Sequence, residues 1–235
     1  LSLARTGSVA DRARLGLAVI HEEAGDIDRA LSLYRDTQLQ FRSSAAFVEA
    51  RRAARRLTGV QGQSTFTRNQ YRDLVRQLRR TARYRIALEL LDEWAESDTA
   101  ELDQIDLERI ETLYAMRAND EAIKACAAFS KNYPSHRQLP RVHLVRFRLA
   151  VRLGRTDEVR ALGGNLWTGA VPGTPLGIKR DTGTLLAAYL VAVGLVDEGL
   201  DIYRELFRIT QNAGAQRTVL WRAGVAALQT NQLER

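Results

Sequence analysis

The sequence predicts an all-α chain, a solenoid of antiparallel helix hairpins with about eleven helices. Apolar residues recur at helical spacing along the chain, and no segment alternates with a period of two for long enough to form a strand. A short turn motif also recurs, in which one helix ends and the next opens with a small residue and, four positions later, a large apolar residue. Together these patterns are typical of helix pairs that stack and bury their apolar faces against their neighbours.

The clearest copy of the turn motif runs from Gly25 to Tyr34. The small-residue positions of its successive copies are Ala30, Ala87, Ala122, Val159 and Gly199. Three of the gaps between these positions are 35, 37 and 40 residues, and the remaining gap of 57 residues leaves room for an extra helix near residues 45–57. Small residues are expected at these positions because paired helices approach to about 8–10 Å between their axes.

The repeats divide the chain in order. Residues 1–162 are expected to hold repeats one to four together with the extra helix. Residues 163–180, the one stretch rich in Gly and Pro, are expected to form an irregular loop that carries Trp167. Residues 181–235 then hold a fifth repeat and the first helix of a sixth, in one continuous solenoid. The chain begins with Leu1 and stops where a partner helix should follow, so the natural protein is expected to continue beyond Arg235.

Charge is unevenly distributed along this basic chain, whose net charge is +7. Only three of its 35 basic residues are lysines, and eleven arginines fall within residues 51–85, against one acid. Residues 89–111 contain ten acids and one arginine. Two interpretations remain open. The arginines form a basic face for a partner, or carboxylates of the acidic stretch (Asp103, Asp106, Glu108 or Glu111) neutralise them internally.

Chemistry typical of an enzyme is missing. His21, His136 and His143 lack the spacing of a metal site, and neither a phosphate-binding loop nor a nucleophile elbow occurs. Cys126 occupies a core position, and no apolar run approaches the roughly 18 residues that span a bilayer. We therefore expect no catalytic residue, no metal, no cofactor and no transmembrane segment.

The hairpins resemble a divergent tetratricopeptide array over most of the chain. The aromatic-Leu-Gly start of that family appears only in part, at Trp221 and Gly224, and the glycine before the second helix is missing from the second and third copies. The resemblance implies a concave groove lined by the first helix of each repeat. In this register the groove residues are Asn69, Arg72, Arg76, Arg79, Arg80, Arg141, Arg148 and Arg152. Such a groove would suit a protein or peptide partner that is acidic or carries a phosphate.

A looser resemblance is to the helical-repeat region of bacterial soluble lytic transglycosylases, through Trp221-Arg222-Ala223-Gly224. It implies a cell-wall accessory region, peptidoglycan as a partner and a catalytic domain after residue 235. Glu96-Ser97 matches that family's Glu-Ser pair, but the surrounding motifs are absent, so we do not assign it as an active site.

The expected function is thus a non-catalytic scaffold that mediates protein–protein interaction. The first alternative is the lytic transglycosylase region. The second is nucleic-acid binding through the arginines of residues 51–56, which lack interleaved aromatic residues for base stacking. The compartment, bacterial cytoplasm or periplasm, stays open.

Overall fold

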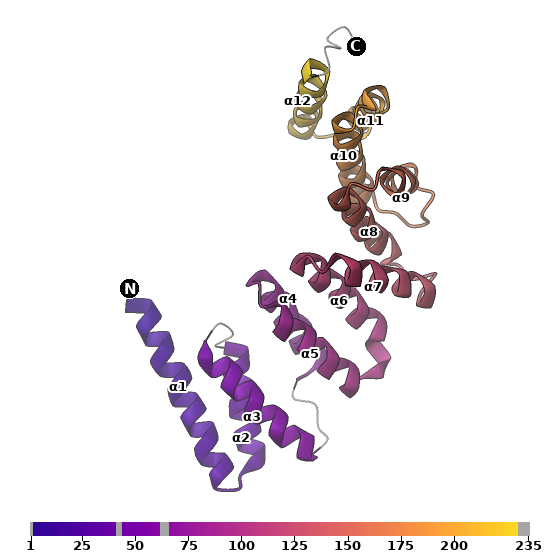
Figure 1. Cartoon of the computed structure of the whole chain (residues 1–235). Helices are drawn as coiled ribbons and strands as arrows, with labels where there is room; N and C mark the ends of the chain where they lie inside the picture. The colour runs from indigo at the N-terminus through magenta and orange to yellow at the C-terminus, as the bar shows by residue number, and fades with distance from the viewer. Residues whose placement is uncertain (1, 41–43, 62–65, 230–235) are drawn as a thin grey trace. The chain divides into compact units, whose positions relative to one another are not determined.

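A computed structural model describes residues 2–40, 44–61 and 66–229 (Figure 1). In these residues it contains twelve α-helices, one short 3₁₀ helix and no strand, so the all-α prediction is confirmed for this part of the chain. The helices are α1 (Ser2–Glu23), α2 (Ile27–Gln40), α3 (Ala45–Gln61), α4 (Arg68–Arg80), α5 (Tyr84–Ser97), η1 (Thr99–Glu101), α6 (Leu102–Met116), α7 (Asn119–Asn132), α8 (Leu139–Leu153), α9 (Thr156–Thr168), α10 (Leu176–Ala192), α11 (Val196–Ile209) and α12 (Ala213–Gln229).

The chain divides into two compact units. The first is Leu1–Arg117, with helices α1 to α6, and the second is Ala118–Arg235, with helices α7 to α12. Each unit is described by itself. The arrangement of the whole chain as one continuous solenoid stays a prediction.

Within each unit, helices that follow one another along the chain pack together. In the first unit α1 packs on α2, α2 on α3, α4 on α5, and α5 on α6. In the second unit each helix from α7 to α12 packs on the next. Further contacts join helices two apart: α1 to α3, α4 to α6, α8 to α10, and α10 to α12. In the second unit the α8–α9 hairpin therefore packs against the α10–α11 hairpin as well as internally.

The recurring sequence motif forms a recurring turn. In each copy the first helix ends at a residue with left-handed backbone: Gly25, Ala82, Arg117, Gly154 and Gly194. Five residues later lies the small-residue position of the motif, and it is buried in every copy. Its N–H donates to the carbonyl oxygen four residues earlier, as from Ala30 to Asp26 at 3.0 Å and from Gly199 to Leu195 at 3.2 Å. The same local geometry therefore starts the second helix of each hairpin.

The expected irregular loop at residues 163–180 is wrong over much of its length. Residues 163–168, Trp167 included, belong to α9, and α10 already begins at Leu176. Gly163 lies within α9, where it permits close packing: a Cβ atom there would lie 2.7 Å from the Phe147 ring of α8. The extra helix is present as α3 and extends four residues beyond its expected end at residue 57.

Aromatic side chains fill the core of the first unit between α3, α4, α5 and α6. Tyr71 of α4 stacks on Trp94 of α5 with ring centroids 5.8 Å apart, and Phe47 of α3 is fully buried in the same cluster. In the second unit Trp167 contacts two apolar clusters that join α8 to α12. None of the helices in the described segments has both the length and the apolar character needed to cross a membrane.

Candidate functional site

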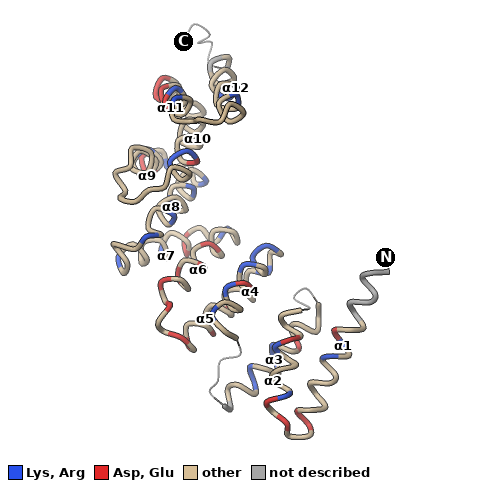
Figure 2. The backbone as a smooth tube through the Cα atoms, turned by 180° about the vertical axis from the view of Figure 1, so that it is seen from behind, with Lys and Arg blue, Asp and Glu red and all other residues tan. Residues whose placement is uncertain are grey.

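Helix α4 carries the longest row of predicted site residues. Thr67 begins it with a capping box, in which its side chain accepts from the N–H of Gln70 and the Gln70 side chain accepts from the N–H of Thr67. Apolar residues bury one stripe of the helix: Tyr71, Leu74, Val75 and Leu78. Polar residues occupy the rest of it, five arginines together with Asn69, Gln70, Gln77 and the exposed Asp73, and the arginines appear as the blue stretches along α4 in Figure 2. Arg72, Arg76 and Arg79 are spaced by four and three residues, which places them on one face.

A buried carboxylate from α6 joins two of these arginines. Arg76 Nε donates to Glu108 Oε1 at 2.7 Å, and Arg79 Nη1 donates to Glu108 Oε2 at 2.8 Å. The Glu108 side chain is only 4% exposed, whereas that of Arg76 is 40% exposed. Glu108 is therefore the buried anchor, and the guanidinium of Arg76 reaches from it to the surface.

The outer members of the α4 row do not use a carboxylate of the described residues. Arg72 Nη2 donates to Asn69 Oδ1 at 2.7 Å, while its buried Nε has no hydrogen-bond partner among the described atoms. Arg80 is exposed at the end of the helix and forms no ion pair within the described part of the chain. The structure thus brings Asn69, Arg72, Arg76 and Arg79 together along α4 and leaves Arg80 in solvent.

Ion pairs between helices neutralise part of the charged blocks. Arg51 of α3 is buried and lies 3.0 Å from Glu93 and 3.6 Å from Glu89, both on α5. Burial lowers the pKa of this guanidinium, and the two carboxylates oppose that effect. Arg68 similarly pairs with Asp98 and Glu101. Carboxylates of the acidic stretch therefore neutralise part of the basic block: Glu108, which was named from the sequence, and Glu89, Glu93, Asp98 and Glu101, which were not.

Three of the predicted site residues lie on α8 in the second unit. Arg141 is exposed near the start of the helix. Arg148 Nη2 lies 3.6 Å from Asp181 Oδ2, and Arg152 Nη1 donates to Asn119 Oδ1 at 3.0 Å. The grouping of these three with the α4 arginines in one groove stays a prediction.

Some of the residues on which the two alternative functions depend have partners within the chain. Of the α3 arginines, Arg56 pairs with Glu22, while Arg52 and Arg55 are exposed. Glu96 is exposed, and the Ser97 hydroxyl donates to the Trp94 carbonyl oxygen at 3.0 Å. Within the described segments, no three His, Cys, Asp or Glu side chains gather as a metal site would require.

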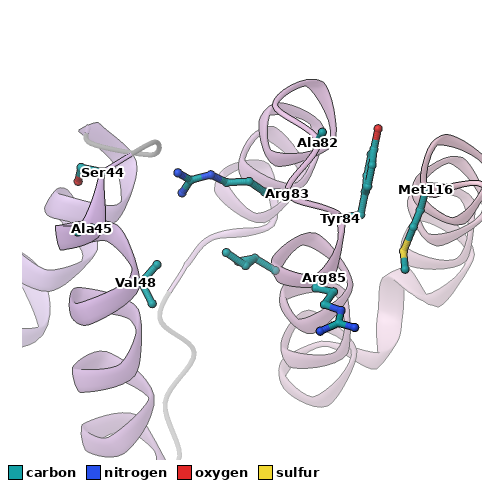
Figure 3. A pocket seen from close by; sticks show the side chains of 9 residues that line it. Ser44, Ala45, Val48, Ala82, Arg83, Tyr84, Arg85 and Met116 are labelled. Atoms are coloured by element: carbon teal, nitrogen blue, oxygen red, sulfur yellow. The ribbon is translucent and has the colours of Figure 1, made fainter. Parts of the chain in front are cut away.

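The sequence did not reveal a pocket of about 540 Å³ in the first unit (Figure 3). Its wall comes from three places: the start of α3, the turn that leads into α5, and the end of α6. The lining residues are Ser44, Ala45, Val48, Ala82, Arg83, Tyr84, Arg85, Ile86 and Met116. The turn was recognisable as a copy of the repeat motif, but the other two walls are remote in sequence, so no local pattern indicates the hollow.

Comparisons with known proteins were made for the whole chain. No protein-family model matches it, and no curated protein matches it. The tetratricopeptide and lytic transglycosylase resemblances therefore depend on the sequence motifs that suggested them.

Proposed function

We propose that this chain is a non-catalytic scaffold of tetratricopeptide type that binds an acidic segment of a partner protein along α4. The observation that carries the proposal is the arrangement of Arg76 and Arg79 around the buried carboxylate of Glu108. Arg72 and Arg80 continue the same helix on either side. Five guanidinium groups thus lie on α4: Glu108 contacts those of Arg76 and Arg79, and Asp98 and Glu101 pair with that of Arg68.

Glu108 leaves much of the binding capacity of these arginines unused. A guanidinium has five N–H donors in a rigid planar fork, which suits bidentate contact with a carboxylate or phosphate. The side chain of Arg76 remains 40% exposed and that of Arg79 17% exposed while both contact Glu108. Their outward donors can therefore meet a second, external acidic group.

Glu108 also reduces the cost of binding. Holding a long side chain in one rotamer costs about 0.5–1.5 kcal/mol when a partner does it at an interface. In this unit the buried carboxylate already holds two arginines, and Asn69 holds Arg72. An acidic segment would thus meet a preorganised row of cations, and its binding should weaken as salt concentration rises.

The test uses variants at the outer arginines, because charge reversal at Arg76 or Arg79 would also leave Glu108 buried beside a like charge. The double variant Arg72→Glu, Arg80→Glu should lose affinity for a fluorescein-labelled polyglutamate peptide by about tenfold or more in polarisation titrations at low salt. The matched control is Arg52→Glu, Arg55→Glu, which makes the same change of net charge on exposed arginines of α3. Equal losses in the two double variants would attribute binding to net charge and reject the α4 site.

The two alternative functions would give other results with the same proteins. As a lytic transglycosylase region, the chain would co-sediment with purified peptidoglycan; exposed Trp221, in the Trp-Arg-x-Gly sequence of α12, favours this candidate. As a nucleic-acid-binding protein, it would bind random oligonucleotides through exposed Arg52 and Arg55. The double variant Arg52→Glu, Arg55→Glu would then lose more affinity for oligonucleotides than Arg72→Glu, Arg80→Glu.

A further inference from the structure

The pocket at the start of α5 has the lining of a site for an apolar group. Six of its lining residues are apolar or aromatic: Ala45, Val48, Ala82, Tyr84, Ile86 and Met116. Met116 is 38% exposed, although it is a large apolar side chain, and Ala45 and Ala82 are exposed as well. A volume of about 540 Å³ lies within the range of about 300–1,000 Å³ that is usual for ligand sites.

Charge at the pocket is of one sign. Arg83 and Arg85 are the only charged residues among those that line it. Figure 3 shows Arg83 extending from the start of α5 toward the first turn of α3, where Ser44 and Ala45 lie. Both helices begin at the pocket, and the N-terminal end of a helix carries a partial positive charge. The apolar hollow therefore has a rim that suits a carboxylate.

The backbone around this pocket is also unusual among the hairpin turns. Three of the five left-handed turn residues are glycines, and the other two are Ala82 and Arg117. Ala82 lines the pocket, and Met116, which also lines it, directly precedes Arg117. Left-handed backbone at a residue with a side chain costs free energy, and residues strained in this way cluster at functional sites.

We infer that this pocket receives one large apolar side chain of a partner peptide, with an acidic residue beside it in contact with Arg83 or Arg85, which extend to different sides of the start of α5 (Figure 3). The charge of the rim selects the acidic neighbour, and the apolar lining selects the anchor. The inference rests on the proposed function in one respect, the acidic nature of the partner. It adds that a second element of the partner, an apolar anchor, is recognised at a separate place in the first unit.

A random peptide library displayed on phage is the probe, because it presents acidic and apolar residues in every combination. It is selected in parallel on the natural chain and on Ala45→Trp, which places an indole in the pocket from an exposed position at the start of α3. The matched control is Ala213→Trp, at an exposed alanine that begins α12. Circular dichroism melts verify that each variant is folded.

The natural chain and Ala213→Trp should enrich peptides that carry a Trp, Phe or Leu next to Asp or Glu. The Ala45→Trp protein should enrich acidic peptides without that apolar residue. A peptide selected on the natural chain should bind Ala45→Trp about tenfold more weakly or worse, as expected for a lost anchor residue. If Ala45→Trp does not fold, Arg85→Glu should cause a similar loss, with the exposed Arg208→Glu as its control.

The outcomes separate this inference from the proposed function. Enrichment of acidic peptides with no apolar preference would overturn the pocket and leave the α4 site intact. Enrichment of apolar peptides with no acidic preference would overturn both the acidic partner and the role of the two arginines. Identical selections on the natural chain and Ala45→Trp would also overturn the pocket. Displacement of a naphthalenesulfonate dye from the pocket by oleate, and by none of the selected peptides, would assign it to a lipid instead.

Discussion

Ala82 has the same left-handed backbone conformation as Gly25, with φ angles of 57° and 78°, and each lies five residues before a fully buried alanine. In both turns the N–H of the following residue donates to a carbonyl oxygen five residues earlier: Asp26 to His21 at 2.9 Å, and Arg83 to Leu78 at 2.8 Å. The two turns are therefore equivalent in geometry. Gly25 adopts this backbone geometry without strain, whereas Ala82 does not.

The variant Ala82→Gly should therefore stabilise the chain by about 0.5–1 kcal/mol. Relief of the left-handed strain, about 1–2 kcal/mol, outweighs the added flexibility of the unfolded chain. Chemical denaturation measures the difference. The control Ala13→Gly, at an exposed position within α1, should instead destabilise by about 1 kcal/mol. Destabilisation by both substitutions would show that residue 82 is not strained.

Gly199 gives the opposite case, a glycine that is required for close packing. A Cβ atom there would lie 2.8 Å from the backbone oxygen of Ala187 and 2.6 Å from Val191 Cγ2 on α10. Because a backbone atom cannot move aside as a side chain can, Gly199→Ala should destabilise by about 1–3 kcal/mol. Gly164→Ala in α9, where no atom would contact the new Cβ, should stabilise by about 0.5–1 kcal/mol. Thermal melts should show a lower melting temperature for Gly199→Ala and a higher one for Gly164→Ala.

The sequence predicted elements well where the signals are local. The turn motif before Ala87 was recognised in the sequence, and in the structure it lies between α4 (Arg68–Arg80) and α5 (Tyr84–Ser97). A capping threonine and a recurring turn mark those ends, and neither depends on distant contacts. Gly163 shows the limit, because it was expected from the sequence to lie in an irregular loop. Its true role depends on the Phe147 ring of a neighbouring helix, which the local sequence does not indicate.

The candidate site was predictable to a similar degree. The tetratricopeptide register grouped Arg72, Arg76 and Arg79, their helical spacing places them on one face, and the acidic stretch was a recognised source of counter-charges. Which carboxylate pairs with them depends on how α4 packs on α6, and the structure selects Glu108, 32 residues after Arg76. The pocket at Arg83 required three remote segments to come together, so sequence patterns could not have located it.

His143 should make the stability of the chain depend on pH. Burial lowers its pKa below the ordinary value of 6.5, and the charge of Arg146 lowers it further. As the pH falls through 6.5, the unfolded chain takes up the proton first, so the free energy of unfolding decreases until the folded pKa is reached. Urea denaturation at about pH 7.5 and about pH 5.5 should show this loss, and His143→Gln should reduce it. Arg146→Gln should reduce it less, and an unchanged loss in His143→Gln would contradict the assignment.

Glu108 offers the sharpest separation between a structural and a binding role for the α4 arginines. The variant Glu108→Gln keeps the size of the side chain and removes the charge that Arg76 and Arg79 contact at 2.7 and 2.8 Å. Loss of these charge-assisted hydrogen bonds should destabilise the first unit by about 1–3 kcal/mol. If the arginines bind an acidic segment, the same change should strengthen binding of the polyglutamate peptide, because it removes a negative charge beside the site while the remaining amide oxygen can still accept from one of the two arginines. Stability and affinity should then move in opposite directions, measured by urea denaturation and polarisation titration on one preparation. A purely internal ion pair predicts the loss of stability with no gain in affinity, and that result would remove Arg76 and Arg79 from the binding site.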